Sequence, residues 1–204
     1  MKFLGLTIEE MLSWNCHINQ ILSTLSSACY AVKVITPLKS EDTLKMIYYS
    51  YVHSIITYGK TFWGNSPHNT DIFKIQKRII RIMKKSRSRD SCRWLFKRLE
   101  ILPLQSQYIL SVLLFVVKNK DLYITKQEGH NINTRSNINL HPPVCNWTVF
   151  QKGVYCSGLK LFNHLPLKIE SLSNEMKLFT PALKRFLNLH SSYSAEEYFE
   201  YSYN

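Results

Sequence analysis

Lysine and arginine side chains recur at the spacing of one helix face in the stretch DIFKIQKRIIRIMKK, which runs from Asp71 to Lys85. Wound as a helix at about 100° per residue, this stretch gathers six cations within an arc of about 120° and leaves apolar side chains opposite them. The six cations are Lys74, Lys77, Arg78, Arg81, Lys84 and Lys85. Cations that share one helix face can neutralise the phosphates of a nucleic-acid backbone, and the pattern indicates this chemistry.

Basic side chains continue beyond this helix, whereas acidic ones are scarce around it. Arg87 and Arg89 follow in an Arg/Ser loop, and the only carboxylates from position 71 to 100 are those of Asp71, Asp90 and Glu100. Like charges at i,i+4 destabilise a helix by roughly 0.2–0.5 kcal/mol per pair, so an anionic partner would turn repulsion into attraction. We expect a polyanion on this face; the alternative is a solvated surface helix. Asn69 or Asp71 is expected to cap the helix, and Asp90 to form an ion pair with the arginines.

No arrangement of side chains typical of an enzyme accompanies this face. The phosphate-binding, nucleophile-elbow and zinc-protease motifs are absent, and the acidic pairs are adjacent residues at expected helix starts or on surfaces. His53 is a lone histidine within an expected helix, which favours a packing role over catalysis. One set has the ligand types of a zinc site but irregular spacing, so we expect packing residues there; it comprises His141, Cys145, Cys156 and His164.

The overall charge also favours an anionic partner. Among 204 residues, 26 are Lys or Arg and 14 are Asp or Glu, which gives a net charge of +12. Such an excess is typical of proteins that bind nucleic acid or an anionic membrane surface. The five cysteines are odd in number and form no C-x-x-C pair, which fits a reduced, intracellular setting. The most apolar segment, residues 108–117, has half the length of a membrane span, so we expect an intracellular, soluble protein with no membrane partner and with nucleus or cytoplasm left open.

Hydrophobic periodicity predicts a mainly α-helical chain. We expect one short N-terminal strand or hairpin at 2–8, helices at 14–34, 40–59 and 71–85, a turn at 62–67, and further helices at 91–99, 104–118, 149–163 and 174–189. The expected domains are a strand remnant at 1–12, a helical bundle at 13–102, a helical C-terminal region at 103–190 with an irregular loop at 119–147, and a tail at 191–204. The acidic, Tyr-rich tail is expected to fray, or alternatively to fold back on the basic surface.

Five short motifs occur in an order known from one family. They are Phe3-Leu4-Gly5-Leu6, Trp14 with His17-Ile18, Tyr58-Gly59 with Trp63-Gly64, Ile75-Gln76-Lys77-Arg78 with Arg81, and Ile101-Leu102-Pro103. This series resembles the carboxyl-terminal part of reverse transcriptases of non-LTR (LINE-type, jockey-like) retrotransposons, over residues 2 to about 190. The resemblance implies the end of the palm followed by a thumb-like bundle that grips the RNA and DNA of a template–primer duplex by its backbone.

The resemblance also implies what this part of the family lacks. The polymerase centre, a Tyr-x-Asp-Asp motif with Mg²⁺, belongs to the palm and does not occur in this sequence, so no catalytic residue is carried over and no cofactor is expected here. We expect a non-catalytic fragment whose partners are nucleic acid and an upstream palm domain. Expected phosphate contacts are Lys77, Arg78 and Arg81, then Lys74, Lys84 and Lys85, with Arg87 and Arg89 reaching a second strand. The alternatives are a helical protein-interaction module, an autonomous polymerase and a pseudogene product without function.

Overall fold

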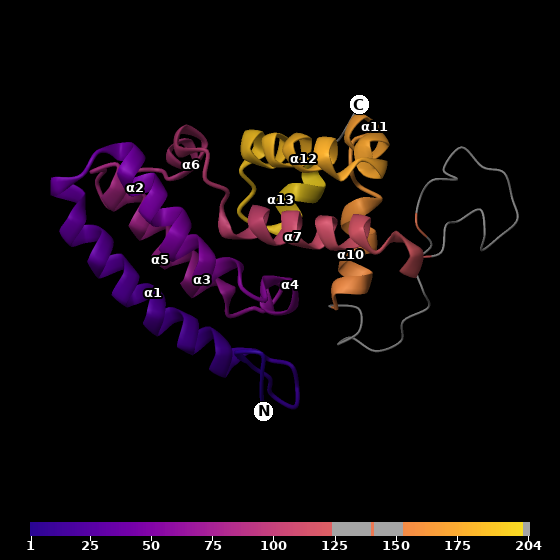
Figure 1. Cartoon of the computed structure of the whole chain (residues 1–204), viewed down its shortest axis with the longest axis horizontal. Helices are drawn as coiled ribbons and strands as arrows, with labels where there is room; N and C mark the ends of the chain where they lie inside the picture. The colour runs from indigo at the N-terminus through magenta and orange to yellow at the C-terminus, as the bar shows by residue number, and fades with distance from the viewer. Residues whose placement is uncertain (124–139, 141–152, 202–204) are drawn as a thin grey trace, which may run out of the picture.

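The protein is mainly α-helical, and its N-terminal strands form a small hairpin (Figure 1). The structure is a computed structural model that describes residues 1–123, 140 and 153–201. Its strands are β1 (Lys2–Phe3) and β2 (Leu6–Thr7). Its helices and helical turns are α1 (Asn15–Ile35), η1 (Thr36–Leu38), α2 (Glu41–Ile47), η2 (Tyr48–His53), α3 (Ser54–Thr57), α4 (Lys60–Trp63), α5 (Asn69–Met83), α6 (Arg93–Leu99), α7 (Leu104–Lys118), η3 (Lys120–Leu122), α10 (Val154–Phe162), α11 (Leu167–Glu170), η4 (Ser171–Asn174), α12 (Met176–His190) and α13 (Ala195–Glu200).

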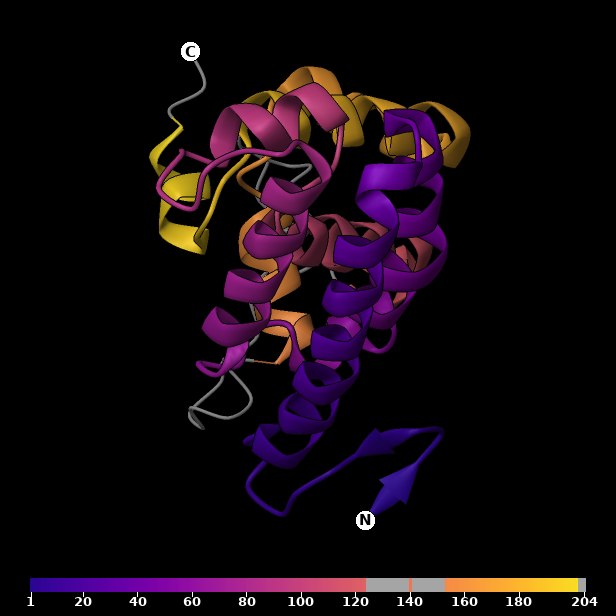
Figure 2. The same cartoon turned by 90° about the vertical axis from the view of Figure 1, so that its left-hand side faces the viewer.

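The first residues form two antiparallel strands joined by a tight turn. Lys2 pairs with Thr7 and Phe3 with Leu6, while Leu4 and Gly5 take positive φ angles of 45° and 77°. A two-residue turn with both central residues at positive φ matches the twist of the flanking strands, and glycine adopts that conformation without a steric penalty. The sequence 2–8 is therefore a hairpin rather than a single strand. Figure 2 shows the hairpin next to the N-terminal end of α1.

Helix α1 packs along α5 and presents a polar surface outward. Ile18, Ile21, Leu25 and Val32 are buried on its inner side. Exposed polar side chains cover its outer side, among them Asn19, Gln20, Ser23, Thr24, Ser26 and Ser27. By length and composition alone Asn15–Leu38 could cross a membrane, and α6 with α7 could do so only as a pair bent by 53°. Because the apolar side of α1 is used in the core, the structure is compatible with a soluble protein.

The segment expected as one helix at 40–59 is continuous but changes its hydrogen-bond pattern in the middle. Ser40 caps α2, and its Oγ accepts a hydrogen bond from the Thr43 N–H at 3.4 Å. The middle turns, η2, form a π-helix before α3 resumes α-helical bonding. Gly59 then reverses the chain with a φ of 60°, close against the Leu6 side chain, and short helix α4 follows where only a turn was expected.

Buried apolar side chains form two clusters that meet near the start of α7. The first comprises residues from Leu6 to Leu104, and the second comprises residues from Tyr108 to Tyr198. In Figure 1, α7 runs from the half that holds α1 to α6 toward the half that holds α10 to α12. In the second half, Gly158 lets α10 lie close against Val112 and Val116 of α7. The expected domain boundary at 102/103 stays a prediction, because the clusters do not show which part folds independently.

Two expectations about the C-terminal half can be compared with the structure. Most of the loop expected at 119–147 lies outside the described residues, which here include only 119–123 and Leu140. The expectation that the tail frays is wrong up to Tyr201: α13 forms, and Tyr198 buries its ring with 1% exposure in the second cluster. The phenol packs there because apolar side chains of the cluster surround its ring and the Leu161 carbonyl accepts a hydrogen bond from its hydroxyl at 3.2 Å.

Candidate nucleic-acid interface

Helix α5 places its apolar side in the core and its charged side at the surface. Ile72, Ile79, Ile80 and Met83 are buried against neighbouring helices, and Ile75 and Ile82 are partly buried. The helix spans Asn69–Met83, so Lys84 and Lys85 lie just beyond its end, with Lys85 at a positive φ of 51°. The helix therefore has the predicted apolar and charged faces. The last two of the six cations, Lys84 and Lys85, lie after the end of the helix and not on its charged face.

The start of α5 differs from the expectation. His68 occupies the N-cap position and makes no side-chain capping bond. Neither Asn69 nor Asp71 caps the helix, because the Asn69 amide instead donates to the Gly64 carbonyl and both residues lie inside the first turn. Asp71 still stabilises this end, since a carboxylate in the first turn complements the helix dipole.

Three of the predicted cations have partners within the chain. Lys74 forms an ion pair with Asp71 at 2.7 Å, and Lys84 forms one with Glu41 of α2 at 2.5 Å. Only 7% of the Lys84 side chain remains exposed, so its charge is already neutralised by a neighbouring element. The Nε and Nη2 atoms of Arg81 donate to the Asp90 carbonyl at 3.1 and 3.0 Å.

Asp90 shapes the loop instead of pairing with arginine side chains. Its carboxylate accepts the Arg87 N–H at 2.8 Å, and its own N–H donates to the Arg87 carbonyl at 3.1 Å. The expected ion pair is thus replaced by a turn that the carboxylate closes, because a short acidic side chain easily reaches a nearby main-chain N–H. With Arg81 bonded to the other side of Asp90, the loop is fixed to α5.

Lys77 lies on an aromatic flank of the helix. Its Nζ is 4.6 Å from the centre of the Phe73 ring and 5.9 Å from that of Tyr193. A cation over an aromatic face gains about 0.5–1 kcal/mol at an exposed site. The side chain therefore has a preferred direction toward the C-terminal segment, although it remains partly exposed.

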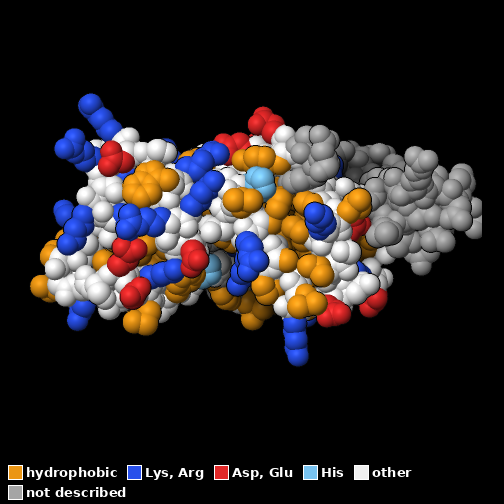
Figure 3. Space-filling model, turned by 90° about the horizontal axis from the view of Figure 1, so that it is seen from above, with side chains coloured by type: hydrophobic (Ala, Val, Ile, Leu, Met, Phe, Trp, Pro, Cys, Tyr) orange, Lys and Arg blue, Asp and Glu red, His pale blue; other side chains and the backbone are white. Residues whose placement is uncertain are grey.

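Four of the predicted cations stay exposed and, within the described residues, their side chains form no hydrogen bond or ion pair. These are Arg78 on α5 and Lys85, Arg87 and Arg89 after it. Lys97 and Arg98 of α6 add exposed charges close by in the sequence. Figure 3 shows Lys and Arg side chains gathered over the end of the molecule formed by α2, α5 and α6, with acidic side chains among them. We call Arg78, Lys85, Arg87 and Arg89 the free cation set.

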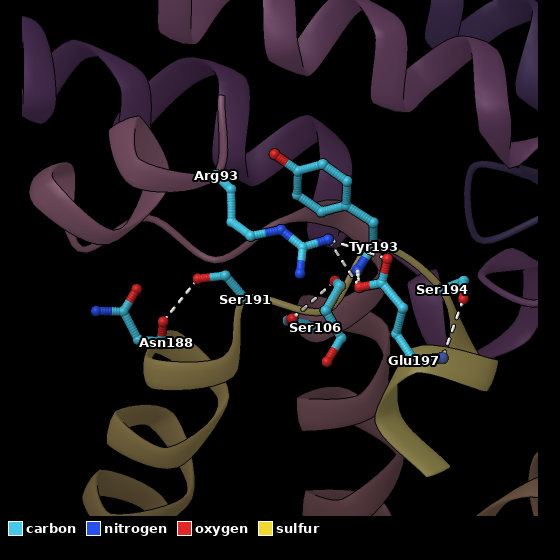
Figure 4. A network of polar contacts seen from close by, with 8 residues as sticks. Arg93, Ser106, Asn188, Ser191, Tyr193, Ser194 and Glu197 are labelled. Carbon is cyan, nitrogen blue, oxygen red and sulfur yellow. Dashed lines mark hydrogen bonds and ion pairs between the residues drawn. The ribbon is translucent and has the colours of Figure 1, made fainter. Parts of the chain in front are cut away.

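The C-terminal segment is held against this region by Arg93. Its Nη2 donates to both carboxylate oxygens of Glu197 at 2.9 Å, and its guanidinium lies 4.5 Å from the Tyr193 ring centre (Figure 4). The Glu197 Oε2 also accepts the Tyr193 N–H at 2.9 Å. Burial raises the pKa of Tyr193 to about 12, so the phenol stays neutral. The tail therefore folds back on basic side chains, the second of the two outcomes that the sequence allowed.

A buried glutamine, which sequence reasoning missed, anchors the inner side of α5. The Gln76 Nε2 donates to the Tyr48 hydroxyl at 2.8 Å and to the Leu102 carbonyl at 3.1 Å, while its Oε1 accepts the Leu104 N–H at 2.9 Å. The side chain is fully buried. The only available signal was a polar residue within the apolar face of the Ile75-Gln76-Lys77-Arg78 motif. This motif thus joins an inward-facing structural residue to outward-facing cations.

Lys60 and His53, both inside the first half, have lowered pKa values. Burial lowers the pKa of Lys60 well below its ordinary value, and its Nζ makes a hydrogen bond to Gln107 at 3.3 Å. Burial, and then the positive charges of Lys60 and Lys184, lower the pKa of His53 to about 4. The His53 ring packs against those of Tyr48 and Tyr49. Packing therefore accounts for His53.

No metal centre emerges from the part of the chain that the structure describes. Two members of the possible zinc set, His141 and Cys145, lie outside the described residues, and Cys156 is buried in α10. Within 1–123, 140 and 153–201, no three His, Cys, Asp or Glu side chains gather closely enough to hold an ion. The expectation that Mg²⁺ belongs only with the palm motif, which the sequence lacks, stays a prediction.

Comparison with protein-family models, curated proteins and solved structures finds no match to this chain. The resemblance to retrotransposon reverse transcriptases therefore rests on the five motifs alone.

Proposed function

We propose that this chain is a non-catalytic, nucleic-acid-gripping part of a non-LTR retrotransposon reverse transcriptase, and that it binds the backbone of a template–primer duplex. The observation that carries the proposal is the free cation set on and just after the outward side of α5. Exposed cations without acidic partners are available to phosphates at no cost in broken ion pairs. The binding is indifferent to sequence, because lysines and arginines on a helix surface contact phosphates rather than base edges.

An exposed apolar surface at the N-terminal hairpin supports the expected contact with a palm domain. Phe3, Leu4, Met11 and Phe62 expose large parts of their side chains. Met11 and Phe62 line one hollow, and the Tyr58 hydroxyl donates to the Leu4 carbonyl of the hairpin turn. Large exposed apolar side chains that gather at a surface mark contact sites with other proteins. In the proposal, this surface docks on the palm and the free cation set faces the duplex.

The salt dependence of binding to an RNA–DNA hybrid tests the proposal. Fluorescence anisotropy of a labelled hybrid gives the slope of log affinity against log salt, which changes by roughly 0.7–0.9 for each phosphate neutralised. A variant with Arg78, Lys85, Arg87 and Arg89 changed to Ala should flatten the slope by about 3. The matched control changes four exposed lysines elsewhere to Ala, and it should keep the original slope; these are Lys39, Lys118, Lys168 and Lys177.

Equal slopes for the two fourfold variants would remove the free cation set from the interface, because both variants lose the same net charge. Two hybrids of unrelated sequence should bind with similar affinity, and a strong preference for one of them would contradict backbone recognition. Primer extension by the purified chain with Mg²⁺ should give no product; extension would overturn the non-catalytic part of the proposal.

A second candidate is a helical module that binds an acidic protein segment. The observation that favours it is the chain's own use of carboxylates on this surface, where Glu41 pairs with Lys84 and Glu197 with Arg93. A peptide with the sequence of residues 195–201 should then compete with a labelled hybrid at concentrations comparable to those of unlabelled hybrid. Under the first proposal, the peptide competes only weakly, since it carries few charges compared with a duplex.

A further inference from the structure

Trp94 exposes half of its side chain on α6, a helix that also carries Arg93, Lys97 and Arg98. Its exposed fraction is 50%, whereas Leu95, Phe96 and Leu99 of the same short helix are buried. Tryptophan is highly buried on average in folded proteins, and exposing this much ring forgoes stabilisation that burial would supply. The ring is thus not needed for the core on its open side, which leaves that side available to a ligand.

The charges around Trp94 indicate what kind of ligand it would meet. The Arg98 guanidinium lies 5.9 Å from the ring centre, and Lys97 is exposed one turn along the same helix. Arg87 and Arg89 lie in the loop that leads into α6, and both are exposed. An exposed aromatic ring beside an arginine, on a helix with further cations, suits a polymer that carries negative charge and flat rings together, which describes a nucleic-acid strand.

The support beneath Trp94 is rigid. Phe96 packs against Phe73 of α5 with ring centres 6.2 Å apart, and Arg81 fixes the preceding loop through the Asp90 carbonyl. Arg93 fixes the other side of α6 to the C-terminal segment through Glu197. A platform held from several sides loses little conformational freedom when a base stacks on it, so more of the stacking energy appears as affinity.

We propose that Trp94 stacks on an unpaired base, and that the surface therefore prefers a nucleic acid with a single-stranded end over a fully paired duplex. The inference rests on the proposed function, because Arg87, Arg89 and Arg98 hold the backbone that presents the base. Bases inside a duplex are stacked on one another and cannot offer a face to the indole, whereas the bases of an overhang can.

Three hybrids with the same paired region test the inference by fluorescence anisotropy. One is blunt, one carries a short single-stranded overhang, and one carries an overhang of equal length made of abasic sites. Stacking is worth a factor of roughly 5 to 150 in affinity per base, so the normal overhang should bind more tightly than the blunt hybrid by a factor in that range. The abasic overhang should bind much like the blunt hybrid, because it adds phosphates without bases.

Trp94→Ala should abolish the advantage of the normal overhang and change the affinity for the blunt hybrid by less than about twofold. Trp94→Tyr should retain most of the advantage, since an aromatic face remains. Tyr30→Ala removes an exposed ring of α1 and serves as the control that should change neither affinity. Thermal denaturation followed by circular dichroism checks that each variant is folded.

The outcomes separate this inference from the proposed function. If all hybrids bind in a salt-dependent way but Trp94→Ala retains the overhang advantage, the stacking role is wrong and backbone binding stands. If the abasic overhang binds as tightly as the normal one, phosphates and not bases supply the preference, and the stacking role is also wrong. If no hybrid binds, the proposed function is wrong, and the stacking role of Trp94, which depends on it, is wrong as well.

Discussion

Removal of the Glu197 side chain tests whether the C-terminal segment is fixed to the basic surface in solution. In Glu197→Ala, Arg93 loses both carboxylate oxygens and the Tyr193 N–H loses its acceptor. Both charged side chains are about one-third exposed, at 38% for Arg93 and 32% for Glu197, so water screens the ion pair. We therefore assign the ion pair about 0.5–1 kcal/mol, in the range of partly exposed pairs.

The main-chain contact adds the larger share. A hydrogen bond from an N–H to an ionised carboxylate contributes about 1.5–3 kcal/mol, and partial exposure places this one at the lower end. The sum predicts that Glu197→Ala lowers the free energy of unfolding by about 2–3 kcal/mol. For a chain of about 200 residues, this corresponds to a decrease in the melting temperature of roughly 4–12 °C. Glu197→Gln retains an acceptor for the Tyr193 N–H and should cost only about 0.5–1 kcal/mol.

Thermal and urea denaturation measure these changes, and hydrogen exchange of residues 193–200 locates them. Glu196→Ala is the matched control, because Glu196 is an exposed neighbour on the same helix that makes no ion pair with another described residue. A double-mutant cycle with Arg93→Met isolates the energy of the pair. The reasoning is refuted if Glu197→Ala is no more destabilising than Glu196→Ala, or if hydrogen exchange in α13 does not change.

Three further substitutions test the interior. Gln76→Leu removes the partner of the Tyr48 hydroxyl and of the Leu104 N–H, whereas the Leu102 carbonyl keeps the Gln107 amide. It should therefore lower the free energy of unfolding by about 2–4 kcal/mol, measured by the urea midpoint; a loss below about 1 kcal/mol would contradict the network. Because burial lowers the pKa of Lys60, the unfolded chain binds an additional proton between the folded-state pKa of Lys60 and its ordinary pKa, and stability rises with pH across that range. Lys60→Met should flatten this rise in melts at pH 7, 8.5 and 10, whereas an unchanged slope would place Lys60 in water. Gly64→Ala should destabilise the chain by about 1–3 kcal/mol in the same melts, because a Cβ there would overlap the Tyr108 ring, and wild-type stability would show that this contact relaxes.

Hydrophobic periodicity was sufficient for helices of about two turns or more and insufficient for those of a single turn. The expected helix at 104–118 coincides with α7, and the expected helix at 14–34 differs from α1 by one residue at each end. Helices such as α4 and α11 complete only about one turn, which is too short for a 3.6-residue period to emerge. The π-helical turns of η2 could not be predicted from the sequence either, because they alter the hydrogen-bond pattern without interrupting the apolar stripe.

The candidate interface was predictable in outline and not in its pairings. Local periodicity determines which side of α5 faces outward, and the structure agrees on this division. Local periodicity does not determine which residue from a distant part of the chain packs against the outward side of α5. Glu41 is 43 positions from Lys84, and Glu197 is 104 positions from Arg93. Such ion pairs depend on how whole helices pack together. The local sequence pattern around α5 therefore could not reveal that Glu41 pairs with Lys84.

The ion pairs and hydrogen bonds also show which cations have a structural role within the fold and which have none. Lys84 and Lys85 follow the C-terminus of α5, and cations are stabilised there by the helix dipole whether or not a ligand exists. Arg81 serves the loop through Asp90. Arg87 and Arg89 lie in a loop, beyond the reach of a dipole, and their side chains have no acidic partner among the described residues. Because nothing in the described fold uses these two charges, they distinguish an anion-binding surface from an ordinary solvated helix more sharply than the cations of α5 itself.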